Sequence, residues 1–102
     1  MYTVNISGLT FEWDDEKNAD NIRKHGVSFG AAMAAFEDES APCYFDADHS
    51  QEEERYLLLG MCPSHGILVV SHCYREEELT IRIISARKAN EKEKNEYRRY
   101  YA

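Results

Sequence analysis

Three arginines lie in or beside apolar stretches of the sequence, where a charged side chain is costly to bury without an anion. Arg82 lies in the middle of an isoleucine-rich stretch, Arg87 follows it, and Arg55 precedes a second apolar stretch. A guanidinium group binds two phosphate oxygens at once, so these residues favour a phosphate-binding surface on which Arg82 contacts the phosphate. The alternative is that they lie on a solvated sheet face and pair with Glu54 or with the glutamates at 76–78.

Acid–base groups accompany these arginines. His25 titrates near neutral pH when it is unperturbed, and Tyr97 can donate a proton or stack on a base. RNA supplies its own nucleophile, the 2′-hydroxyl, so its cleavage needs a base, an acid and cations on the phosphate, but no metal. These residue types therefore fit metal-free cleavage of RNA. The alternatives are that His25 interacts with a helix dipole and that Tyr97 is a packing residue.

An acidic loop is the second group of residues with potential for chemistry. It brings Asp46, Asp48, His49 and Glu52 close together, and carboxylates with an imidazole can bind metal ions. The spacing does not match a calcium-binding loop, because no glycine follows where such a loop needs one. We favour a solvated acidic loop over a metal site, and we expect neither a metal nor a cofactor.

Local patterns predict the elements that position these residues. Asp14 is a good N-cap and Gly26 a good C-terminal stop, which predicts a helix over about 15–25. An apolar stripe predicts a second helix over about 29–36, and a capping box that begins at Asn90 predicts a C-terminal helix. Strands are predicted at 2–6, 10–13, 43–45, 54–62, 67–75 and 79–86.

The order of these elements predicts a single α+β domain over residues 1–102. Two N-terminal helices, with a strand before them, are followed by an antiparallel β-sheet meander and a C-terminal helix. The first helix has a thin apolar stripe with Asn18, Asn21 and His25 beside it. Asn is a poor helix former, so this polar side is predicted to face another surface; the alternative is a solvated side.

The 102-residue chain has a net charge of −7 that is unevenly distributed. Residues 1–54 contain 13 acidic and 3 basic residues, which gives −10, whereas residues 55–102 contain 6 acidic and 9 basic residues, which gives +3. A polyanion prefers the second half, and we expect Lys88, Tyr97 and Arg98 to contact RNA there.

Composition also bounds the location of the chain. No apolar run approaches the roughly 20 residues of a membrane span, and residues 1–6 lack the pattern of a signal peptide. The three cysteines, Cys43, Cys62 and Cys73, have no paired spacing and are predicted to be buried apolar residues. A reducing, cytoplasmic location is therefore expected.

Several motifs resemble those of the BrnT toxin family, a branch of the RelE-like toxins. In order they are Phe-Glu-Trp-Asp at 11–14, Lys-His-Gly-Val-Ser-Phe at 24–29, Asp-x-Asp-His-Ser at 46–50, Glu-Arg-Tyr at 54–56 and Arg-Ile-Ile-Ser-Ala-Arg at 82–87. The resemblance covers nearly the whole chain. It implies a RelE-like fold and a small type II toxin that cleaves RNA and inhibits translation.

The resemblance also implies a partner and a site. The partner is a cognate ribbon-helix-helix antitoxin, similar to BrnA, through which alone the toxin contacts DNA. By motif match, catalytic roles fall on Lys24, His25, Arg55, Arg82 and Arg87. Two other functions remain open: a catalytically inactive relative that serves as a protein-interaction module, and a metal-binding module built on the acidic loop.

Overall fold

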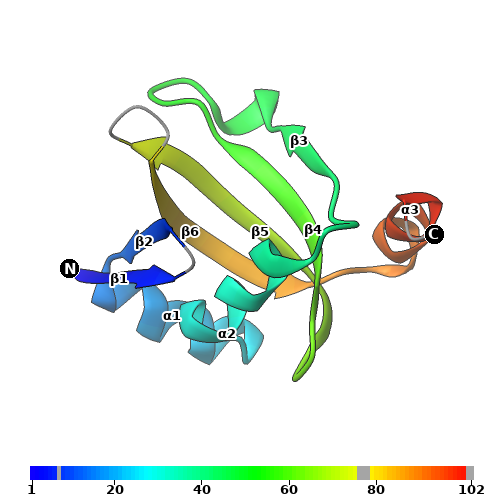
Figure 1. Ribbon diagram of the computed structural model, residues 1–102, viewed down its shortest axis with the longest axis horizontal. Coiled ribbons are helices and arrows are strands. Elements are labelled where there is room, and N and C mark those ends of the chain that lie inside the picture. The colour runs from blue at the N-terminus through cyan, green and yellow to red at the C-terminus, as the bar shows by residue number, and fades with distance from the viewer. Residues whose placement is uncertain (7, 76–78, 101–102) are drawn as a thin grey trace.

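A six-stranded sheet forms the centre of the computed structural model, which describes residues 1–6, 8–75 and 79–100 (Figure 1). The order across the sheet is β1-β2-β6-β5-β4-β3, and the two strands of each neighbouring pair are antiparallel except β2 and β6, which are parallel. The strands are β1 (Tyr2–Ile6), β2 (Leu9–Trp13), β3 (Cys43–Phe45), β4 (Tyr56–Cys62), β5 (Gly66–Arg75) and β6 (Thr80–Lys88).

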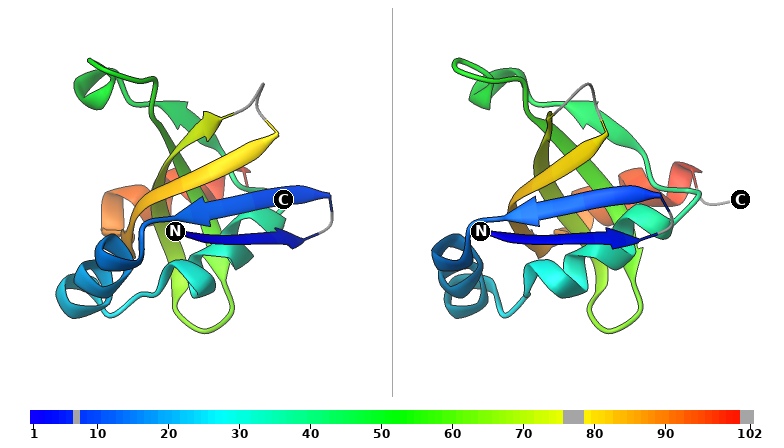
Figure 2. Two further views of the ribbon diagram at one scale, coloured as in Figure 1. Left: turned by 90° about the vertical axis from the view of Figure 1, so that its left-hand side faces the viewer. Right: turned by 60° about the vertical axis from the view of Figure 1, so that its left-hand side comes forward.

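In the described part of the chain, three α-helices and two short 3-10 helices accompany the sheet: α1 (Asp15–His25), α2 (Phe29–Ala32), η1 (Met33–Glu37), η2 (Ala47–His49) and α3 (Glu91–Tyr100). The predicted α+β class is confirmed, and β3 to β6 form an antiparallel meander after α1 and α2, but this meander is only part of a mixed sheet. β1 and β2 form a hairpin ahead of α1, and β2 pairs with β6, the last strand (Figure 2). Local sequence patterns do not reveal this pairing, in which Thr10 lies opposite Thr80. The glutamates at 76–78, considered above as partners of the arginines, lie outside the described residues.

The helix α1 begins and ends where the sequence predicts. The Asp14 carboxylate accepts hydrogen bonds from the backbone N–H groups of Glu16 (2.9 Å) and Lys17 (3.2 Å). These bonds lower the pKa of Asp14. Gly26 follows the helix with a φ of 70°, a left-handed conformation that glycine adopts without strain.

The two asparagines of α1 hold the helix to the rest of the chain. Asn21 is buried; its amide nitrogen donates to the carbonyls of Val27 (2.8 Å) and Ala86 (2.7 Å), and its oxygen accepts from the Ala86 N–H (3.1 Å). The Asn18 oxygen accepts from the Phe29 N–H (2.8 Å) at the start of α2. The polar side of α1 therefore faces β6 and α2, whereas His25 at its end is exposed.

The main core lies between one face of the sheet and the segment formed by α1, α2 and η1. Its fully buried side chains include Val27, Phe29, Leu68, Val70 and Ile83. The cysteine prediction is confirmed for Cys62 and Cys73, which are buried, but is wrong for Cys43, which is exposed; all three thiols are free.

The opposite face of the sheet is covered at one end by α3, which lies beside β4 and far from α1 (Figure 1). Tyr97 of α3 packs with Leu59 and Val69, and its hydroxyl donates to Asp38 (2.6 Å). Asp38 also accepts from the Met61 N–H (2.8 Å). Burial raises the pKa of Asp38, but these hydrogen bonds outweigh burial and leave the pKa below its usual value.

A row of side chains crosses the part of this face that α3 leaves open. Strand pairing places Tyr44 of β3 opposite Leu57 of β4, Leu57 opposite Ser71 of β5, and Ser71 opposite Ser85 of β6. Paired residues point to the same side of a sheet, so these four side chains lie in one line across the strands. The candidate functional site lies along this line.

Candidate functional site

A cavity of about 380 Å³ lies on the open face of the sheet. Its floor comes from β4, β5 and β6 and includes Leu57, Ser71 and Ser85. Its walls come from the β3–β4 connection and from the end of β6. The wall residues with ionisable side chains are Asp46, Asp48, His49, Arg55 and Arg87. The cavity thus gathers two of the predicted arginines with most of the acidic loop.

The β3–β4 connection is held in shape by Ser50. Its hydroxyl donates to the Asp46 carbonyl (2.6 Å) and accepts from the Arg55 N–H (2.9 Å). The Asp46 N–H donates to the Arg55 carbonyl (2.8 Å), which joins the two ends of the loop. These bonds explain the Asp-x-Asp-His-Ser pattern: the serine closes the loop so that His49 and Arg55 line the same cavity.

His49 and Asp46 form a hydrogen-bonded pair. The distance from His49 Nδ1 to Asp46 Oδ2 is 2.9 Å; the Asp46 side chain is 13% exposed and the His49 side chain 67% exposed. An ionised carboxylate only accepts hydrogen bonds, so it holds the proton on Nδ1 and leaves Nε2 of a neutral ring as an acceptor. This arrangement suits a general base that is open to solvent and held in one orientation.

The two arginines of the cavity differ in how firmly they are paired. Arg87 donates to both carboxylate oxygens of Glu93 at 2.8 Å, which raises the pKa of Arg87 and lowers that of Glu93. Glu93 also accepts from the Asn90 N–H (2.9 Å) in the predicted capping box, so Arg87 fastens β6 to α3. Among the residues that the structure describes, Arg55 forms one ion pair, at 4.0 Å with Glu53, which leaves most donors of its guanidinium group available to an anion.

A second hollow continues the site toward α1. It has a volume of about 200 Å³ and is lined by Lys24 and His25 of α1, with Ile84 and Ser85 of β6. Ile84 and Ser85 also line the central cavity. Lys24 and His25 therefore lie on the α1 side of Ser85, whereas Arg55 and His49 lie on the other side, in the central cavity.

Arg82 lies away from the central cavity. It is opposite Glu12 across the parallel β2–β6 pair, and its Nε lies 3.5 Å from the Glu12 carboxylate. The strand that holds Arg82 contains no acidic residue, and its partner, Glu12, comes from the neighbouring strand β2.

The residues predicted to contact RNA also lie elsewhere. Tyr97 is 2% exposed and packs in the core, which favours the alternative that it is a packing residue. Lys88 is exposed at the end of β6, and Arg98 on α3 donates to Asn95 (2.9 Å). Neither residue lines the central cavity.

The sequence did not indicate His49 as a candidate acid–base residue. The motif placed it in an acidic loop, where a solvated or metal-binding role was considered. The available signal was the spacing of Asp46 and His49, three residues apart, with Ser50 to close the loop. Among the described residues, no group of three or more His, Cys, Asp or Glu side chains is placed to hold a metal ion.

Comparison with known proteins places this arrangement in a class. Residues 13–93 match a family of ribonuclease toxins from type II toxin–antitoxin systems. This match confirms the resemblance of the motifs, and the chain belongs to that family, BrnT. None of the curated proteins matches the chain.

A solved structure supports the same assignment. The fold is similar to the 1.1 Å crystal structure of the Brucella abortus ribonuclease toxin BrnT, with 28% sequence identity and a TM-score of 0.61. The match covers 79% of this chain and 96% of the Brucella chain. Within the described residues, no helix combines the length and apolar character that crossing a membrane requires.

Proposed function

We propose that this chain is a metal-independent endoribonuclease that inhibits translation by cleaving RNA in the cytoplasm. The supporting observation is that the Asp46–His49 pair and the weakly paired Arg55 line one cavity on the open sheet face. A base and a cation that both reach one phosphate are what cleavage by a 2′-hydroxyl requires.

In the proposed mechanism His49 acts as the base. Its Nε2 removes the proton of a 2′-hydroxyl, and the 2′-oxygen attacks the adjacent phosphorus to form a 2′,3′-cyclic phosphate. The bond to the 5′-oxygen breaks, and that oxygen takes a proton from an acid. Asp46 stabilises the imidazolium that forms, because it accepts from Nδ1 throughout.

The cations and the acid come from both sides of the cavity. Arg55 binds the phosphate oxygens, whose negative charge grows in the transition state. His25 is assigned as the acid and Lys24 as a second phosphate contact, because both line the adjoining hollow. Arg87 shapes the cavity through Glu93, and Arg82 is assigned a structural role.

The partner is a small antitoxin similar to BrnA that blocks the cavity and binds operator DNA through a ribbon-helix-helix domain. The family supports an antitoxin, because type II toxins are paired with a protein antitoxin. The mixed signs of charge on this chain provide complementary surfaces for such a segment. The toxin itself then contacts DNA only through the antitoxin.

Cleavage of a single-stranded RNA by the purified chain tests the mechanism. His49→Ala is expected to lose about 10²- to 10⁴-fold in rate, and Arg55→Ala about 10²- to 10³-fold. The matched controls are His65→Ala, at the β4–β5 turn, and Arg75→Ala, which removes the other arginine beside Glu53. Both controls should cleave at the parental rate, and a chelator should leave the parental rate unchanged.

Other outcomes assign other functions. Loss of cleavage in chelator, restored by one divalent ion, would give the acidic loop a metal-binding role. A parental chain that cleaves no RNA, yet binds the protein encoded by a neighbouring gene, would be an interaction module. Growth arrest by the chain alone, relieved by that neighbour and absent in His49→Ala, is the expected result in cells.

A further inference from the structure

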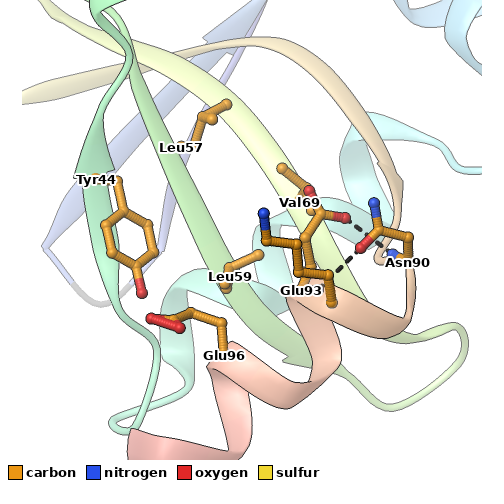
Figure 3. Close-up of a pocket in the computed structure, with 8 residues that line it drawn as sticks. Tyr44, Leu57, Leu59, Val69, Asn90, Glu93 and Glu96 are labelled. Atoms are coloured by element: carbon orange, nitrogen blue, oxygen red, sulfur yellow. Dashed lines mark hydrogen bonds between the residues drawn. The ribbon is translucent and has the colours of Figure 1, made fainter.

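A cavity of about 560 Å³ adjoins the central cavity on the open sheet face (Figure 3). The two cavities share Leu57 and Val69 in their walls. The adjoining cavity lies between β3, β4 and β5 on one side and the first turns of α3 on the other. It begins at Tyr44, the last residue of the line of side chains that crosses the sheet. The mechanism above assigns this cavity no role.

The floor of the cavity is apolar and suits a flat ring. Leu57, Leu59 and Val69 point into it from the two strands, and the Tyr44 ring stands beside them (Figure 3). A volume of several hundred Å³ is typical of small-molecule sites. Proteins that recognise single-stranded RNA hold unstacked bases against apolar and aromatic side chains in this way.

One polar group in the cavity is buried without a partner. The Tyr44 hydroxyl is shielded from solvent and makes no hydrogen bond with any described residue. Burial, together with nearby Tyr100 and Glu96, raises the pKa of Tyr44 to about 12. The phenol therefore keeps its proton at physiological pH and is a donor that lies near the Glu96 carboxylate but forms no hydrogen bond with it in this structure. A buried group of this kind is costly unless a ligand supplies the acceptor.

A carboxylate lies next to this donor. The Glu96 side chain points toward the Tyr44 hydroxyl from α3 (Figure 3). Its ion pair with Arg99, at 3.5 Å, is a surface pair whose arginine is 76% exposed, and such pairs are weak. The other carboxylate of the cavity, on Glu93, is already held by Arg87 and Asn90. Glu96 is therefore the acceptor that is available to a ligand.

We propose that this cavity binds a guanine base next to the cleaved phosphate, an inference that rests on the proposed ribonuclease function. A phenol donor beside a carboxylate presents one donor and two acceptors in sequence. The Watson–Crick edge of guanine presents the complement: the O6 acceptor, then the N1–H and N2–H₂ donors. Tyr44 donates to O6, and Glu96 accepts from N1 and N2.

The other bases fit this order less well. Cytosine and adenine place a donor where Tyr44 also donates, and uracil offers Glu96 only one donor. The charged residues that line this cavity are Glu93 and Glu96 with one cation, Lys92, and this balance disfavours a phosphate there. The central cavity, with Arg55, takes the phosphate, and the shared wall at Leu57 and Val69 makes the base subsite its direct neighbour.

Cleavage of a random-sequence RNA pool, read by sequencing the ends, tests the proposal. The parental chain is expected to enrich guanine at one position beside the cut. Glu96→Gln and Tyr44→Phe should each lower the preference for guanine over adenine by about ten- to a hundredfold, the range for one good hydrogen-bonded base contact. The controls are Glu91→Gln, on the same helix with its side chain 83% exposed, and Tyr2→Phe on β1; both should keep the parental preference.

A binding measurement gives a readout that does not depend on cleavage. Guanosine monophosphate should shift the methyl resonances of Leu57, Leu59 and Val69 in the parental chain, whereas adenosine monophosphate should not. Those shifts should be absent in Glu96→Gln. Equal shifts with both nucleotides, or none with either, would overturn the proposal.

The cleavage outcomes separate this proposal from the one on which it rests. If the parental chain cleaves but enriches no base, or if Glu96→Gln keeps the enrichment, the base subsite is wrong and the ribonuclease assignment stands. If the parental chain cleaves no RNA, both are wrong. If both variants lose antitoxin binding while the base preference persists, the cavity holds a protein segment and the proposal is overturned.

Discussion

At the scale of single residues, the arginines of the sheet differ in what already occupies their guanidinium groups. Arg87 is held by two short bonds to Glu93, Arg82 lies 3.5 Å from Glu12, and Arg55 has, among the described residues, a 4.0 Å contact with Glu53. The charge of Arg87 is therefore committed to holding α3, whereas Arg55 can change partners at little cost. Arg55 is proposed as the phosphate contact because its guanidinium group is weakly paired. The apolar sequence around each arginine does not distinguish it from Arg82 and Arg87.

The Arg82–Glu12 pair leads to a prediction about stability. Both side chains are largely shielded, at 24% and 17% exposed, so Arg82→Ala leaves the Glu12 carboxylate poorly compensated. We expect a loss of about 1–3 kcal/mol in the free energy of unfolding. Once folded, the variant should cleave RNA at the parental rate. Urea denaturation measures the first quantity and a cleavage assay the second.

A double-mutant cycle provides the control for this prediction. Glu12→Gln should remove part of the same stability, and the double variant should lose less than the sum of the two single losses. If Arg82→Ala has parental stability and cleaves a hundredfold more slowly, Arg82 contacts the phosphate and its structural role is wrong.

Residue types alone predicted which positions are polar but not which surface they face. Asn18 and Asn21 were expected to face a surface, and they do, but the surface is the backbone of β6 and α2. Tyr97 illustrates the same limit, because its acceptor, Asp38, lies 59 residues away in the sequence. Hydrogen bonds across such separations depend on the tertiary structure, whereas the caps of α1 depend on neighbours and were predicted correctly.

At the scale of elements, η1 packs unusually closely against β4. A Cβ atom at Gly60 would lie 2.5 Å from the Ala35 carbonyl oxygen and 2.8 Å from its Cβ. The sequence predicted this segment as the end of one helix over 29–36; the last residues instead tighten into the 3-10 helix, which lies over Gly60. The glycine in the middle of a strand is thus explained by the close approach of another backbone.

This contact predicts that Gly60→Ala is destabilising. The backbone of η1 must move to admit the methyl group, and overpacking of this kind typically costs about 1–3 kcal/mol. The matched control is Gly30→Ala in α2, where the nearest atom to the added Cβ is 3.8 Å away. That change should be neutral or stabilising by up to about 1 kcal/mol, because alanine is the better helix former. Thermal melts of the two variants test the pair; equal melting temperatures would show that η1 yields freely.

At the scale of the whole molecule, the acidic and basic halves of the sequence do not form separate surfaces at the candidate site. The basic second half supplies Arg55 and Arg87 to the open sheet face, but the acidic first half supplies Asp46 and Asp48 to the same cavity. The hydrogen bonds of the β3–β4 connection and the β4–β5 and β5–β6 pairings bring these residues together, and local sequence patterns do not indicate which side chains then share a cavity. For this reason the α+β class was predictable, whereas the composition of the site was not.

This mixed site predicts a weak dependence of RNA binding on salt. Each phosphate neutralised by the protein contributes about 0.7 to the slope of log K against log salt for a single strand. Arg55 in the central cavity, and Lys24 with His25 in the adjoining hollow, provide two cations, or three when His25 is protonated. The slope is therefore expected to be about −1.4 to −2.1. Fluorescence anisotropy with a 2′-O-methyl RNA, which lacks the nucleophile, measures it without cleavage.

Variants identify the surface that produces this slope. Arg55→Ala should reduce its magnitude by about 0.7, because one phosphate contact is lost. Lys88→Ala and Arg98→Ala should leave it unchanged, since neither side chain lines the central cavity. A slope steeper than about −4, reduced by these two variants, would move the RNA to the end of β6 and to α3. In that case Lys88 and Arg98 would contact RNA, as the sequence predicts, and the RNA would not lie along the line of side chains that crosses the open sheet face.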